Sequence, residues 1–162
     1  SVIIKTPAFL RFEVYGPFGG VAALIVSNGG SLYVYSDGRS AIYGQHDLDT
    51  PLPLPAELLV SALMGDTMRL KNLAQTSGNA GGASYTIEGT NLNGLKLVKY
   101  DNGTPVVTAH LDNFKEIGGD LIPLEVTIND LKTGNTILIK HSSVEINPEV
   151  PSSTFVPPAL IQ

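Results

Sequence analysis

The chain has 162 residues, 43% of them hydrophobic and only 15% charged, and its formal net charge at pH 7 is −5. This composition excludes a disordered chain and fits one globular domain over residues 1–162. With no basic run and no cysteine, the sequence argues against nucleic-acid partners, electrostatic docking on anionic lipid, disulfides and thiolate metal sites.

The organising stretch is residues 9–15, where apolar and polar residues alternate as in a half-buried strand. Leu10, Phe12 and Val14 share one face of this strand, and Arg11 and Glu13 share the other.

A tight turn is predicted directly after this strand, at residues 16–20. Pro17 suits the turn, and the glycines around it permit backbone angles that are closed to other residues. The large apolar side chain of Phe18 stands at its tip, where small polar residues are usual. Two interpretations stay open: Phe18 meets an apolar surface outside the molecule, or it folds back onto its own hairpin.

Further strands are expected at residues 21–26, 31–35 and 40–43, separated by the turn signals Ser27-Asn28-Gly29-Gly30 and Ser36-Asp37-Gly38-Arg39. Leu32 and Val34 share one face of the strand at 31–35. This part of the chain is therefore predicted to be an antiparallel meander.

A proline-rich stretch over residues 45–55 leads into a predicted helix, and Pro55 suits its first turn. The apolar stripe of this helix consists of Leu58, Leu59, Ala62 and Leu63. Gly65 is placed to end it, and Asp66 or Thr67 can cap a second short helix. That second helix would carry Met68, Leu70, Leu73 and Ala74.

Strands resume at residues 83–88, 95–100, 104–111, 122–128 and 136–142. Leu124 and Val126 lie on the apolar face of the strand at 122–128. Four prolines in the last segment predict that it runs extended or in turns along the surface.

These elements predict a mainly β (α+β) protein: a large, curved antiparallel sheet with a helical insertion that covers its concave face as a lid. The interior beneath the lid would be lined by apolar residues of the strands and of the helix: Leu10, Phe12, Val14, Leu32, Val34, Leu58, Leu59, Leu63, Leu124 and Val126. Periodicity leaves open whether this interior is a solid core or a cavity.

No catalytic, cofactor or metal site is expected. His46, His110 and His141 stand in no metal-ligand spacing, and the carboxylates beside His46 are interpreted as solvated charges of a linker. The sequence also lacks the GxSxG motif of hydrolases and the Lys-Ser/Thr that follows a phosphate-binding loop.

Several short motifs together resemble the LolA/LolB family of outer-membrane lipoprotein carriers, and its LolB-like branch in particular. The first is the strand and Pro-apolar-Gly loop of residues 10–19, followed by the two turn signals before residue 40. The second is Leu52-Pro53-Leu54-Pro55 with the helix that ends at Gly65. The third is Val144-Glu145-Ile146-Asn147-Pro148 with Ser153-Thr154-Phe155.

This resemblance implies an unclosed β-barrel whose hydrophobic cavity accepts lipoprotein or lipid acyl chains. It implies that Pro17 and Phe18 form a loop that contacts the outer membrane, and that a periplasmic LolA-like carrier is a partner. It also implies a bacterial lipoprotein at the periplasmic face of the outer membrane. The family's signal peptide, lipid-bearing cysteine and leading helix have no counterpart in residues 1–162, so these parts are expected to be missing from the sequence.

The alternative is a structural or protein-interaction β-domain of the cell envelope. In that case the interior is solid and the Phe18 loop docks a partner protein.

Overall fold

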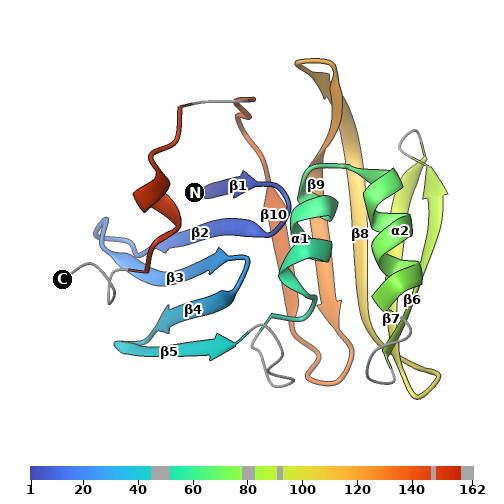
Figure 1. Cartoon of the computed structure of the whole chain (residues 1–162), viewed down its shortest axis with the longest axis horizontal. Helices are drawn as coiled ribbons and strands as arrows, with labels where there is room; N and C mark the ends of the chain where they lie inside the picture. The colour runs from blue at the N-terminus through green and yellow to red at the C-terminus, as the bar shows by residue number, and fades with distance from the viewer. Residues whose placement is uncertain (45–51, 78–82, 91–92, 147–148, 158–162) are drawn as a thin grey trace. The chain divides into compact units, whose positions relative to one another are not determined.

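The computed structural model describes residues 1–44, 52–77, 83–90, 93–146 and 149–157. The chain is mainly β, as the sequence predicts, and it forms two compact units (Figure 1). The first unit combines residues 1–52 with residues 149–162, and the second comprises residues 53–148. That both act as one domain stays a prediction. The expected linker charges around His46 lie outside the described residues.

The first unit contains a five-stranded antiparallel sheet in the order β1-β2-β3-β4-β5. Its strands are β1 (Val2–Lys5), β2 (Phe9–Tyr15), β3 (Val21–Asn28), β4 (Ser31–Ser36) and β5 (Arg39–Gly44). This confirms the predicted meander. The turn between β4 and β5 places Asp37 and Gly38 at φ 53° and 75°, the paired positive angles that match the twist of a two-residue hairpin.

The strand register sorts the side chains of this sheet onto two faces. Leu10 pairs with Ser27, which pairs with Leu32, and Phe12 pairs with Ile25, which pairs with Val34. Because directly opposed residues of antiparallel strands point to the same side, one face carries the apolar residues that the sequence analysis groups together.

The opposite face of the same sheet is covered by residues 149–157, which we call the strap. The strap contains a 3-10 helix at Ser152–Phe155, and this helix packs against β2 and β3 (red in Figure 1). The ring of Phe155 is buried and meets Phe9 edge-on, with ring centroids 5.5 Å apart. The apolar cluster beneath the strap comprises Leu24, Val26, Tyr33 and Phe155, with Ile3, Phe9, Tyr35 and Val150 packed against it. The predicted surface course of the last segment is therefore wrong for Phe155, whose side chain lies in the core of the first unit.

The second unit has its own five-stranded antiparallel sheet, in the order β10-β9-β8-β7-β6. Its strands are β6 (Ala83–Thr90), β7 (Gly94–Asp101), β8 (Thr104–Ile117), β9 (Asp120–Asp130) and β10 (Thr136–Lys140). The described strands therefore divide between two sheets, whereas the sequence analysis expects one. Two helices, α1 (Ala56–Leu63) and α2 (Thr67–Ser77), interrupt the chain between β5 and β6, so that the last strand of the first meander is not followed by a pairing partner.

The helices lie against the second sheet, α1 at β9 and α2 at β6 (Figure 1). Gly65 ends α1 as predicted, with φ +66° and with N–H groups of Gly65 and Asp66 bonded to the carbonyls of Ala62 and Ser61. A Cβ atom at Gly65 would stand 2.1 Å from the carbonyl oxygen of Leu121 in β9. Glycine therefore permits both the turn and a backbone-to-backbone contact between the helices and the sheet.

Of the two predicted caps for α2, Asp66 is the one used, because its Oδ1 accepts a hydrogen bond from the N–H of Arg69 at 2.9 Å. Leu70 and Ala74 of this helix are buried as expected, but Met68 is 76% exposed. Within the described parts of the chain, no helix is long and apolar enough to cross a membrane.

Candidate functional site

The candidate site is the tip of the hairpin that joins β2 to β3. The N–H of Gly19 bonds to the carbonyl of Gly16 at 3.0 Å, which closes a four-residue turn with Pro17 and Phe18 at its centre. Pro17 supplies the φ angle that the first central position requires. A second hydrogen bond, from the N–H of Gly16 to the carbonyl of Gly20 at 2.7 Å, closes the base of the loop. The backbone groups of Gly16, Gly19 and Gly20 thus bond to one another, and the Phe18 side chain is directed away from the loop.

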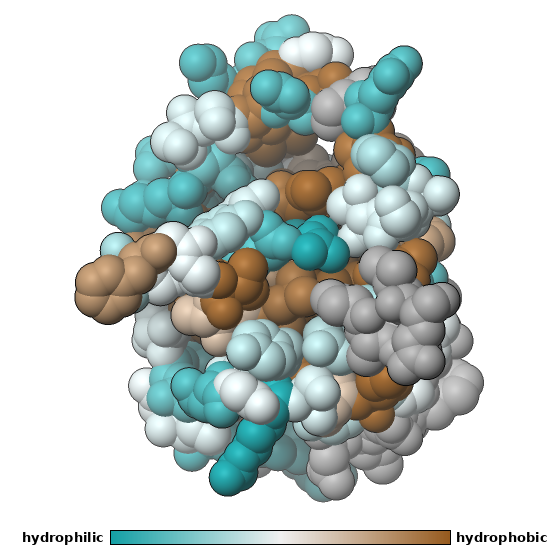
Figure 2. Space-filling view, turned by 90° about the vertical axis from the view of Figure 1, so that its left-hand side faces the viewer, coloured by the Kyte–Doolittle hydropathy of each residue, from teal (hydrophilic) through white to brown (hydrophobic). Residues whose placement is uncertain are grey.

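Phe18 is 100% exposed, which decides between the two interpretations of this loop. It does not fold back onto its hairpin. Val14, Tyr15 and Val21 at the ends of the two strands are also exposed, between 41% and 52%. We call these four side chains, with Pro17, the hairpin tip. Figure 2 looks onto the corresponding side of the molecule and shows hydrophobic residues (brown) among hydrophilic ones (teal).

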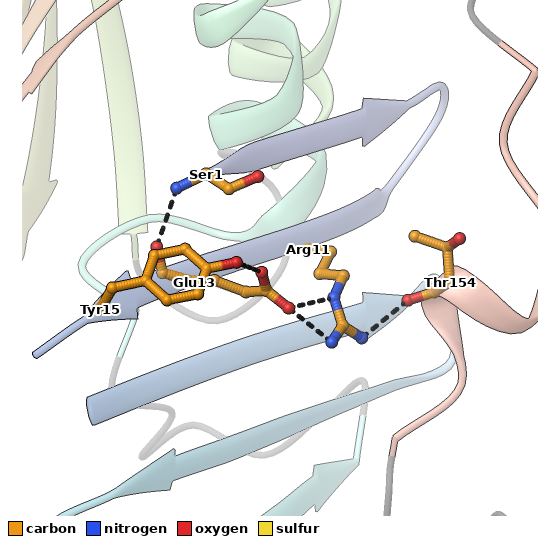
Figure 3. Close-up of polar contacts among 5 residues, drawn as sticks. All are labelled: Ser1, Arg11, Glu13, Tyr15 and Thr154. Carbon is orange, nitrogen blue, oxygen red and sulfur yellow. Dashed lines mark hydrogen bonds and ion pairs between the residues drawn. The ribbon is translucent and has the colours of Figure 1, made fainter. Parts of the chain in front are cut away.

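A chain of polar contacts runs along β2 from the hairpin tip to the strap (Figure 3). The hydroxyl of Tyr15 donates a hydrogen bond to Oε2 of Glu13. The other carboxylate oxygen of Glu13, Oε1, accepts from Nε and Nη2 of Arg11 at 2.7 and 2.6 Å. The remaining terminal nitrogen of Arg11, Nη1, donates to the carbonyl oxygen of Thr154 at 3.0 Å. We call Tyr15, Glu13 and Arg11 the β2 relay.

These contacts shift the titration of the relay. The hydrogen bonds from Tyr15 and then from Arg11 lower the pKa of Glu13 below its ordinary value of 4.5. The same bond to Glu13 raises the pKa of the Tyr15 phenol above 10.0. Glu13 is therefore a carboxylate and Tyr15 a neutral donor over the whole neutral range, so the positive charge of Arg11 is compensated locally.

The ten predicted lining residues fall into two groups of five, one in each unit. In the first unit Leu10 and Leu32 are buried, Phe12 and Val34 are partly buried, and Val14 is exposed at the hairpin tip. In the second unit Leu58, Leu59, Leu63 and Val126 are buried and Leu124 is partly buried. The five strand residues of the first unit share one sheet face, as predicted. That all ten line one cavity stays a prediction.

No group of three metal-ligating side chains occurs among the described residues. Burial lowers the pKa of His141, which favours its neutral form.

Sequence reasoning placed Pro17 and Phe18 in the turn after residue 15, as the structure shows, but missed the β2 relay and the strap contact. The i, i+2, i+4 spacing of Arg11, Glu13 and Tyr15 on one strand face is visible in the sequence, and opposite charges in that pattern can pair. The acceptor of the third Arg11 contact lies 143 residues away, and no local pattern points to it.

A comparison with known proteins shows no protein-family model that matches this chain and no curated protein that matches its sequence.

Proposed function

We propose that this protein is a non-catalytic carrier or receptor that binds the acyl chains of lipoproteins or lipids and contacts the membrane to which it delivers them. In keeping with its resemblance to LolB-like proteins, the membrane would be the bacterial outer membrane, approached from the periplasm, and a LolA-like carrier would be the donor. The observation that supports this proposal is the complete exposure of Phe18 at the head of an apolar hairpin tip.

The chemistry of the hairpin tip suits the interfacial zone of a bilayer. Aromatic residues concentrate there, and the transfer of an aliphatic side chain out of water is favourable. Transfer of Phe18 from water is worth about 1.5–3 kcal/mol, and the smaller exposed fractions of Val14, Tyr15 and Val21 add to it. This suffices for reversible contact and is too little for permanent anchoring, as a protein that delivers cargo requires.

The charge pattern favours a zwitterionic surface over an anionic one. The net charge of −5 repels anionic lipid, and the charges of Arg11 and Glu13 next to the hairpin tip pair with each other. Contact would therefore depend on apolar area and respond little to salt.

Flotation with phosphatidylcholine vesicles tests the membrane contact. Phe18→Asp is expected to reduce vesicle binding by at least about tenfold, since it removes the 1.5–3 kcal/mol of Phe18 and adds a charge. Phe18→Leu should retain most of the binding. Met68→Asp is the matched control, because Met68 is an exposed apolar residue of the second unit and lies outside the hairpin tip.

Equal vesicle binding by wild-type protein and Phe18→Asp would refute the membrane contact. The cargo is tested separately with a fluorescent fatty acid. Its binding should be lost in Leu59→Trp, which fills the interior beneath α1, and should persist in Phe18→Asp. If the wild-type protein binds no acyl probe and Phe18→Asp loses binding to a protein partner, the protein is a protein-interaction β-domain, the alternative given in the sequence analysis.

A further inference from the structure

The hairpin tip and the strap are connected through one strand. Tyr15, Glu13 and Arg11 alternate along the same face of β2, and that face is the one the strap covers. Tyr15 belongs to the hairpin tip, and Arg11 bonds to the strap (Figure 3). Tyr15 and Arg11 bond to different oxygens of Glu13, and the Arg11 nitrogen that does not bond to Glu13 donates to the strap.

The distribution of acceptors on Glu13 determines where Arg11 directs its third donor group. Oε2 is taken by the Tyr15 hydroxyl, so Arg11 places both Nε and Nη2 on Oε1. Nη1 is left over for the carbonyl of Thr154. If Tyr15 withdraws, Oε2 becomes free, and a guanidinium prefers to bind both oxygens of a carboxylate in a fork. The end-on form of this fork uses both terminal nitrogens, so Nη1 would move from the carbonyl of Thr154 to Glu13 and leave Thr154 without its donor.

Among the described residues, the strap has few other polar attachments to the sheet. Within residues 149–157, the hydrogen bonds from the N–H groups of Thr154 and Val156 to the carbonyls of Pro151 and Ser153 stay inside the strap. Its side chains on the sheet are mainly Phe155 and Val150. The Arg11 contact is thus a bond from a charged donor that fixes the 3-10 helix against β2.

We infer that the β2 relay couples membrane contact at the hairpin tip to release of the strap from the first sheet. Two states are defined: with Tyr15 on Glu13, Arg11 holds the strap; with Tyr15 withdrawn, Arg11 binds Glu13 alone and the strap is free. Release uncovers the apolar face of Phe9, Leu24, Val26 and Tyr33, a surface on which an acyl chain can lie while it leaves the protein. The inference rests on the proposed function for the identity of the trigger, a lipid surface.

Such coupling requires that the membrane interact more favourably with one of the two states than with the other, and insertion of the hairpin tip provides this difference. When Phe18 enters the interface, the Tyr15 ring follows with its hydroxyl among the lipid carbonyl and phosphate oxygens, a position that tyrosine favours. Glu13 cannot follow at low cost, because a carboxylate loses its hydration there. The bond between Tyr15 and Glu13 is therefore the one that breaks.

Hydrogen exchange of the Thr154 and Val156 amides measures the state of the strap. In solution, Tyr15→Phe should raise their exchange rates by about tenfold, the factor that corresponds to one hydrogen bond from a charged donor. Tyr35→Phe is the matched control, since Tyr35 is a tyrosine that packs against the same cluster and is not a member of the relay. Its exchange rates should equal those of the wild type. If Tyr15→Phe does not fold, Tyr15→Leu, which also removes the hydroxyl and leaves the Glu13 carboxylate in place, provides the same test.

Phosphatidylcholine vesicles test the trigger. On the wild-type protein they should raise exchange of the two strap amides by a similar factor, and on Tyr15→Phe, which retains an apolar hairpin tip, they should add nothing. Unchanged strap exchange in vesicle-bound wild-type protein overturns the inference, as does an equal effect of Tyr15→Phe and Tyr35→Phe in solution. If the wild type does not bind vesicles at all, the proposed membrane contact fails, and the solution measurement still decides whether the relay holds the strap.

Discussion

The contact between Gly65 and β9 leads to a quantitative prediction for Gly65→Ala. The substitution places an L-residue at φ +66°, which costs about 1–2 kcal/mol by itself. It also places a Cβ atom 2.1 Å from the Leu121 carbonyl oxygen and 3.0 Å from Cδ of Pro123, where ordinary van der Waals contact begins at 3.4 Å. The turn between α1 and α2 must move by more than 1 Å from the sheet, and overpacking of this kind costs about 1–3 kcal/mol. We expect a total loss of roughly 2–5 kcal/mol in the free energy of unfolding.

Urea denaturation followed by circular dichroism at 222 nm is a suitable assay, because both described α-helices belong to the second unit. Gly134→Ala is the matched control: Gly134 has φ +75° in the same unit, and no atom stands within 4 Å of the Cβ it would gain. It should lose only the conformational part, about 1–2 kcal/mol. Equal destabilisation by the two variants would refute the close packing of the helix turn on β9.

Two further predictions concern single side chains. Removal of the α2 cap by Asp66→Ala should lower the free energy of unfolding of the second unit by about 1 kcal/mol, measured by urea denaturation. Asp66→Asn keeps an oxygen acceptor for the Arg69 N–H and should cost much less. Equal losses in the two variants would show that the cap bond is not formed. Because the folded-state pKa of Glu13 is lowered, its interactions stabilise the protein above the ordinary value of 4.5 and are lost as the pH falls through the folded-state pKa. An NMR titration of the Glu13 carboxyl should therefore place its midpoint below 4.5, and a midpoint at or above 4.5 would contradict its hydrogen bonds from Tyr15 and Arg11.

Local features were predictable because local chemistry determines them. The Asp37-Gly38 and Asn102-Gly103 turns have the positive φ angles that these residue types favour in hairpins. Gly65 and Asp66 perform the helix-end roles that their positions indicate. The alternation over residues 9–15 and 31–35 correctly grouped side chains on one face, since the period of a strand is fixed at two.

Features that depend on distant pairing were not predictable in this way. Alternation tells which residues share a face but not which segment covers it, so Arg11 and Glu13 were assigned to a polar face while the strap packs there. The same limit applies to the sheets: strand patterns do not say where pairing stops, and one expected sheet became two. The turn at Gly118-Gly119 was also missed, although β8 and β9 extend to it and glycines at φ 64° and 93° form it.

The position of the strap in the sequence has a consequence for biosynthesis. The first unit is completed only when residues 149–157 emerge, after the whole of residues 53–148 has been made. At typical rates of translation this interval lasts roughly 5–20 s. During that time Leu24, Val26 and Tyr33 lack the Phe155 side chain that packs on them, so the nascent chain carries an uncovered apolar sheet face. The second unit can fold first, although its sequence starts later, and a chaperone that binds apolar strands would find its substrate in the N-terminal segment.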